Sequence, residues 1–153
     1  MSLTVKDMMT KDMITVPPSA SAATVAKIFI EHKFGSIPVV DSNKLLLGQI
    51  AIREFFTIFL PTYIDLIDSF TFVDDFGALE RIFVEGPILE LFVAEDLMNP
   101  NPFVVTEQAS LFKVAALMDR HNTRQLLVAD ADGKLSGIVT MFDIFKVLMK
   151  DKL

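Results

Sequence analysis

The chain has 153 residues, of which 52% are apolar, and it carries a formal net charge of −6 and no cysteine. This length supports one compact core, or two small units that share one, and the apolar fraction excludes an intrinsically disordered chain. The missing cysteine excludes disulfides and thiolate catalysis, and the negative charge argues against a basic surface for nucleic acid.

The same features set expectations for location. The longest uncharged apolar run, residues 55–64, contains Pro61 and falls well short of the roughly 20 residues that a membrane span needs. The first residues include charged side chains, such as Lys6 and Asp7, and lack the apolar core of a signal peptide. We therefore expect a cytoplasmic protein without membrane insertion.

The first half of the chain predicts alternating strands and helices. A short strand over residues 13–16 leads to a helix opened by Ser21, whose hydroxyl is suited to cap the first free amides. A buried strand over residues 37–40, the polar turn "DSNK" and a second strand over residues 46–51 predict a hairpin. The second strand runs into a helix over residues 53–60.

An insert over residues 61–93 separates the two halves. Residues 57–93 hold seven acids and one base, which accounts for the whole net charge of −6. Leu79, Ile82 and Phe83 are spaced for one face of a helix, so the insert is predicted to be partly helical. It either covers the core of the protein itself, or forms a dimer seam, or docks a partner protein.

The second half repeats the first. Shifting the chain by 89 residues aligns residues 5–60 with 94–149 without a gap and gives thirteen identities, where ordinary residue usage predicts about three or four. The repeated order is β-α-β-β-α, with strands at 103–105, 126–129 and 135–140 and helices opened by Ser110 and at 142–149. We therefore predict an α/β (α+β) fold of two pseudo-twofold-related units, residues 1–60 and 94–153, packed sheet to sheet.

The phrase "GIVTMFD" at residues 137–143 has two compatible interpretations. Thr140 and Asp143 have the spacing of a capping box, in which both side chains satisfy free amides at the start of a helix. The same geometry favours ligand binding, because a helix N-terminus attracts phosphate and a fixed carboxylate can accept the hydroxyls of a ribose. The sequence shows neither a paired nucleophile and base nor a cluster with metal-ligand spacing, so we do not expect an enzyme.

Two pairs of repeated motifs and one closing motif carry a family resemblance. "VKDMMT" and "AEDLMN", "SIPVVD" and "QLLVAD", and the closing "GIVTMFD" resemble the tandem cystathionine-β-synthase (CBS) domain pair, or Bateman module, over the whole chain apart from the insert. The resemblance implies a regulatory module, commonly a homodimer, with no obligatory cofactor. It also implies a cleft for an adenosine-containing ligand, AMP, ADP, ATP or S-adenosylmethionine, whose binding is signalled to an effector protein.

The resemblance further implies which residues bind. Second-half residues would contact the ribose and phosphates, and first-half residues would flank the adenine. The implied set is Thr140, Asp143, Ile138 and Arg124 with Met13, Ile14, Pro38 and Arg53.

The equivalent cleft of the other half is poorer. It has Ala51 in place of the hydroxyl, Glu54 in place of the aspartate and Gly35 in place of the base. We therefore expect it to be mainly structural. The alternative is an interaction protein with two degenerate clefts, which uses the insert for dimer or partner contacts.

Overall fold

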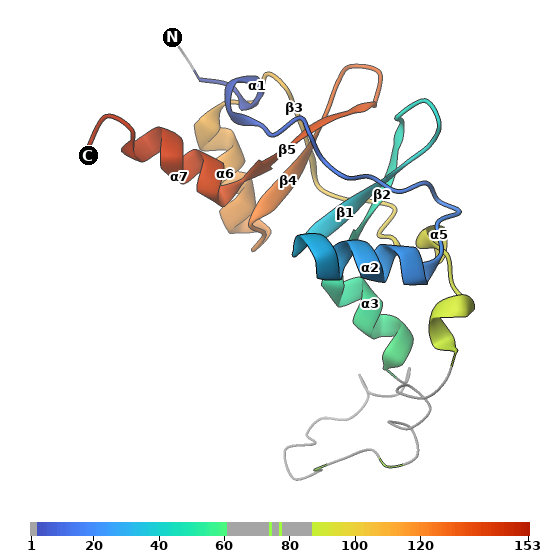
Figure 1. Cartoon of the computed structure of the whole chain (residues 1–153). Coiled ribbons are helices and arrows are strands. Elements are labelled where there is room, and N and C mark those ends of the chain that lie inside the picture. The colour runs from blue at the N-terminus through green and yellow to red at the C-terminus, as the bar shows by residue number, and fades with distance from the viewer. Residues whose placement is uncertain (1–2, 61–73, 75–76, 78–86) are drawn as a thin grey trace.

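The computed structural model describes residues 3–60, 74, 77 and 87–153 (Figure 1). The predicted helical face of Leu79, Ile82 and Phe83 lies outside the described residues. Of the helices in the described part of the chain, none combines the length and the hydrophobicity that crossing a bilayer requires.

Each half contains a hairpin flanked by two helices. The first half consists of α2 (Ala22–His32), β1 (Ser36–Val40), β2 (Leu46–Ala51) and α3 (Ile52–Phe59). The second consists of β3 (Val104–Thr106), α6 (Leu111–Arg120), β4 (Gln125–Ala129), β5 (Leu135–Thr140) and α7 (Met141–Met149). The predicted mixed fold is confirmed. Three short elements were not predicted: α1 (Val5–Met8), the 3₁₀ turn η2 (Ile88–Glu90) and α5 (Ala94–Leu97).

The duplication is preserved in the register of the sheets. β1 pairs with β2 and β4 pairs with β5, both antiparallel, and Ile37 lies opposite Ile50 as Leu126 lies opposite Val139. An irregularity in register follows Val39 in the first hairpin and the equivalent Val128 in the second. Both halves therefore keep the same strand alignment despite their different side chains.

The predicted strand at residues 13–16 is wrong, although its counterpart exists. β3 pairs in parallel with β4 over three residues, whereas the first half has a single parallel bridge between Val16 and Val39. Pro17 and Pro18 follow Val16 directly. Because proline has no N–H to donate, the ladder cannot continue past Val16.

The predicted helix caps are confirmed. Ser21 Oγ accepts a hydrogen bond from the backbone N–H of Thr24 at 3.1 Å, and Ser110 Oγ accepts one from Lys113 at 3.3 Å. The caps fix where α2 and α6 begin, and their apolar residues then face the core, as Val25 and Val114 do at 0% exposure.

The two halves exchange their first segments. Thr10 forms two backbone hydrogen bonds with Ile138 of β5, at 2.8 and 2.9 Å, and Asn99 forms two with Gln49 of β2, at 2.8 and 3.1 Å. Val5 of α1 accordingly lies in the core of the second half. Ala94 and Leu97 of α5 lie in the core of the first half. Each core therefore needs both repeats.

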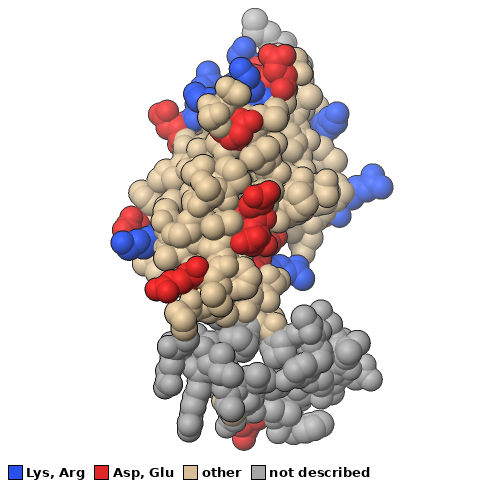
Figure 2. Space-filling view, turned by 90° about the vertical axis from the view of Figure 1, so that its right-hand side faces the viewer, with Lys and Arg blue, Asp and Glu red and all other residues tan. Residues whose placement is uncertain are grey.

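The hairpins also meet directly. Leu46 N–H donates to Gly133 O at 3.1 Å and Leu135 N–H donates to Lys44 O at 3.0 Å. Figure 1 shows the two hairpins side by side, with their turns on the same side of the molecule. The face drawn in Figure 2 is largely uncharged, with acidic side chains near its centre and both acidic and basic side chains toward its edges.

Candidate functional site

Two cavities at the boundary between the halves are related by the repeat, one of about 360 Å³ and one of about 180 Å³. The larger is referred to below as the Glu54 cavity and the smaller as the Thr140 cavity. The 89-residue offset relates their linings, and Ser36 and its equivalent Gln125 line both. The other equivalent pairs, given with the Thr140 cavity first, are Thr10 and Asn99, Phe34 and Thr123, Ile138 and Gln49, and Thr140 and Ala51.

The exchange of first segments builds the Thr140 cavity. The hydrogen bonds between Thr10 and Ile138 hold the first-half chain against β5, and Met13 and Ile14 follow along the wall. Phe34 contributes a further apolar surface, and its ring stacks on His32 at a centroid distance of 5.3 Å. The wall is therefore mainly apolar, which suits the faces of a flat heteroaromatic ring.

Thr140 joins this wall to the start of α7. Its hydroxyl accepts from Asp143 N–H at 3.2 Å, and the Asp143 Oδ2 atom accepts from the Thr140 backbone N–H at 2.9 Å and hydroxyl at 2.8 Å. The other oxygen, Oδ1, lies 3.5 Å from Nζ of Lys146, and the Asp143 side chain is 12% exposed. The predicted capping box is thus formed, and Asp143 lies behind Thr140, outside the lining of the cavity.

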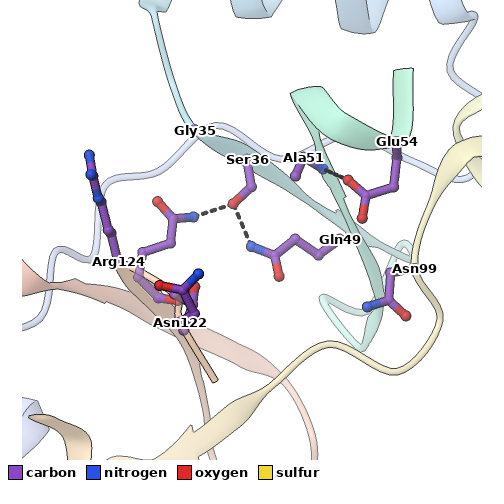
Figure 3. A pocket seen from close by; sticks show the side chains of 10 residues that line it. Gly35, Ser36, Gln49, Ala51, Glu54, Asn99, Asn122 and Arg124 are labelled. Carbon is purple, nitrogen blue, oxygen red and sulfur yellow. Dashed lines mark hydrogen bonds between the residues drawn. The ribbon is translucent and has the colours of Figure 1, made fainter. Parts of the chain in front are cut away.

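The Glu54 cavity has a polar wall. The side-chain amides of Gln49 and Gln125 both donate to Ser36 Oγ, and Glu54 Oε2 accepts from Ala51 N–H at 2.8 Å (Figure 3). Because alanine has no side-chain acceptor, only one half of a capping box is present at α3. Gln49 and Thr123 thus occupy the positions at which the Thr140 cavity has the apolar Ile138 and Phe34.

The structure brings four of the eight predicted binding residues together. They line the Thr140 cavity: Met13, Ile14, Ile138 and Thr140. Two of these residues come from each half of the chain, so the site exists only where the halves meet.

The other four predicted residues lie elsewhere. Asp143 takes part in the capping box, and Pro38 is fully buried in β1. Arg53 is exposed on α3. Arg124 lines the Glu54 cavity, and its guanidinium points away from Ser36 in Figure 3. Their role in binding stays a prediction.

Sequence reasoning missed several lining residues. Ser36 and Gln125 stand at equivalent positions directly before the predicted buried strands, and this equivalence is the signal by which the repeat alignment could have singled them out. Asp12 lies two residues before Ile14, which is the spacing of side chains on one side of an extended chain. Among the described residues, no group of three His, Asp or Glu side chains is placed to hold a metal ion.

Comparisons with known proteins agree with this architecture. A family model for the CBS domain matches residues 5–60 and 93–150. The chain therefore belongs to the CBS domain family and carries two copies of the domain in tandem.

Individual relatives share the whole pair. The chloroplastic CBS domain-containing protein CBSX2 of Arabidopsis thaliana is 30% identical over 97% of this chain, which spans 65% of the length of that relative. A crystal structure of CBSX2 in complex with AMP is similar over 98% of each chain, with a TM-score of 0.73 and 28% identity. A hypothetical conserved protein from Geobacillus kaustophilus is similar over 99% of each chain, with a TM-score of 0.76 and 25% identity.

Proposed function

We propose that the chain is a regulatory, non-enzymatic CBS pair that binds an adenosine-containing ligand in the Thr140 cavity. The convergence of Met13 and Ile14 from one half with Ile138 and Thr140 from the other carries this proposal. The AMP complex of CBSX2 supports the ligand class. The adenine ring would lie between the apolar side chains, and the Thr140 hydroxyl would face the ribose or its substituent.

The predicted polar contacts require adjustment. Oδ2 of Asp143 is engaged by Thr140, so a ribose hydroxyl would be accepted by Oδ1, which now lies beside the exposed Lys146. Arg124 lines the Glu54 cavity and would reach a phosphate in the Thr140 cavity only if its side chain turned. Ligand binding would therefore change the start of α7 and the boundary between the halves. The ligand can shift the equilibrium between the free and the bound arrangement only by the difference in its affinity for the two.

The repeat offers a matched pair of variants to test the site. Ile138→Gln gives the Thr140 cavity the residue of the Glu54 cavity and leaves the capping box intact, and Gln49→Ile makes the reverse change. Burying an amide against the base in place of an apolar side chain is expected to weaken binding about tenfold. Isothermal titration with adenosine, AMP and S-adenosylmethionine should show this loss for Ile138→Gln only. Equal losses in both variants would refute the assignment of the cavity.

The role of Asp143 is tested in the same way. Asp143→Ala and Glu54→Ala each remove a carboxylate that accepts a backbone hydrogen bond at the start of a helix. If Asp143 also binds the ribose, ligand affinity falls mainly in Asp143→Ala. Similar small losses of stability in both variants, with unchanged affinity, would assign Asp143 a capping role alone.

We propose further that the chain forms a homodimer through α3 and α7. Phe56 and Phe145 stand at equivalent positions of these helices and are 58% and 54% exposed, beside the exposed Ile52, Met141 and Phe142. Exposed apolar helix faces of this kind are typical of protein interfaces. Sedimentation equilibrium should give a dimer that Phe56→Glu and Phe145→Glu convert to monomer, and a monomeric parent protein would refute the proposal.

The effector protein and the cytoplasmic location stay predictions. The rival interpretation, an interaction module with two degenerate clefts, is favoured by one observation: Thr140 and Asp143 already satisfy each other. It predicts that the protein binds no adenosine compound at millimolar concentration.

A further inference from the structure

The Thr140 cavity has an acidic residue in its wall. Its described lining consists of Thr10, Asp12, Met13, Ile14, Phe34, Ser36, Gln125, Ile138 and Thr140. Asp12 is the one charged residue in this set, and no lysine or arginine belongs to it. This lining differs from the prediction for an anionic ligand, which places a cation at the phosphates.

The sides to which successive residues point explain why Asp12 faces the cavity. Thr10, Asp12 and Ile14 line the Thr140 cavity, whereas Lys11 and Thr15 line a neighbouring cavity together with Lys44; Met13, between them, lines both. Alternation of this kind is expected of an extended chain, whose successive side chains point to opposite sides. The hydrogen bonds between Thr10 and Ile138 fix the phase of the alternation, so Lys11 is turned away from the ligand.

The nearby cations are engaged or directed elsewhere. Arg124 lines the Glu54 cavity, and Lys146 lies 3.5 Å from Asp143. Within the described part of the chain, no lysine or arginine nitrogen lies within ion-pair distance of Asp12. The negative charge of Asp12 is therefore not compensated by a direct partner.

The small size of the Thr140 cavity limits where the 5′ substituent of a bound adenosine compound can lie. Its volume of about 180 Å³ is below the range of about 300 to 1,000 Å³ that is typical of small-molecule sites. Thr10 and Asp12 are the exposed residues of its described lining, so they lie at its rim. With the adenine against the apolar wall, as proposed above, the 5′ substituent would reach this rim. At a separation of about 6 Å in water, the interaction of Asp12 with one unit charge on the ligand changes the ligand affinity about threefold. Its repulsion of the two negative charges of a phosphate lowers the affinity about tenfold.

We infer that Asp12 makes the Thr140 cavity select adenosine compounds with a cationic or neutral 5′ substituent over AMP, ADP and ATP. This inference rests on the proposed function and names the ligand class within it. S-adenosylmethionine, whose sulfonium and ammonium groups outweigh its carboxylate, represents the cationic class, and adenosine represents the neutral class. The preferred order is S-adenosylmethionine, then adenosine, then AMP.

The test uses the change Asp12→Asn, which also gives the residue type found at the equivalent position, Asn101. Isothermal titration at low salt measures the affinity for S-adenosylmethionine, adenosine and AMP. We expect AMP to bind about tenfold more tightly to the variant, S-adenosylmethionine about threefold more weakly, and adenosine unchanged. Asp119→Asn, an exposed acid on α6 outside the lining, changes the net charge equally and should alter none of the three.

The outcomes distinguish a failure of the charge selection from a failure of the proposed adenosine site. If AMP binds wild type more tightly than adenosine does, or if Asp12→Asn leaves the ratio of affinities unchanged, the charge selection is wrong while the adenosine site stands. A larger loss of AMP affinity in Arg124→Ala than in the Asp119→Asn control would also refute it, because Arg124 would then supply the missing cation. If none of the three compounds binds, the proposed function fails together with the inference.

Discussion

The exchange of first segments predicts that Gly48 tolerates no side chain. A Cβ atom on Gly48 would lie 2.7 Å from the carbonyl oxygen of Asn99 and 2.7 Å from Sδ of Met98. The sulfur ends a flexible side chain, but the carbonyl belongs to backbone that Gln49 holds through hydrogen bonds of 2.8 and 3.1 Å. Gly48→Ala must therefore displace the segment that follows α5.

The loss of stability caused by Gly48→Ala can be estimated from these contacts. Overpacking of a fitted site typically costs about 1 to 3 kcal/mol, and each weakened hydrogen bond adds about 1 kcal/mol. We expect Gly48→Ala to lower the free energy of unfolding by about 2 to 4 kcal/mol. At the equivalent Gly137 the closest contact, at 2.6 Å, is Sδ of Met9, and the Thr10 carbonyl is at 3.0 Å, so Gly137→Ala should cost less, about 1 to 2 kcal/mol.

A third glycine provides the control. A Cβ on Gly35 would meet its nearest atom, Oε1 of Gln125, at 3.8 Å, so Gly35→Ala should stay within about 0.5 kcal/mol of the parent protein. Urea unfolding followed by circular dichroism at 222 nm measures all three variants. The expected order of destabilisation is Gly48→Ala, Gly137→Ala, Gly35→Ala. A Gly48→Ala variant as stable as Gly35→Ala would show that the exchanged segments do not pack as described.

Three further outcomes are expected. Lys44 has a φ of 65°, where the equivalent turn position has Gly133 at 79°, so Lys44→Gly should raise stability by about 1 kcal/mol in urea unfolding. Ser110→Ala removes the cap of α6 and should lower stability by about 1 kcal/mol in the same assay. The Thr4 backbone N–H, and then its hydroxyl, lower the pKa of Asp7 by donating to its carboxylate. This stabilisation is full above the usual pKa of aspartate and is lost as pH falls through the lowered value, so wild type and Asp7→Asn should converge in stability in acid.

The Thr140 cavity shows which site residues can be predicted from the sequence and which cannot. Met13, Ile14, Ile138 and Thr140 were assigned by resemblance, and the structure gathers them in one cavity. Arg124 was expected in the same place because it directly precedes the buried strand, but the path of its side chain takes it to the other cavity. Side-chain direction depends on neighbours that are distant in sequence, and the repeat alignment does not supply them.

The sequence by itself determined the duplication, the hairpin and the two longer helices of each half and the capping of those helices, because these depend on local periodicity and on residues three positions apart. Only the tertiary structure decided that the halves exchange their first segments, since Val5 is as apolar as any other core residue and nothing local says which core it enters. That exchange turns Asp12 toward the Thr140 cavity and Lys11 away from it. The charge at the candidate binding site is therefore a property of the packed pair of repeats.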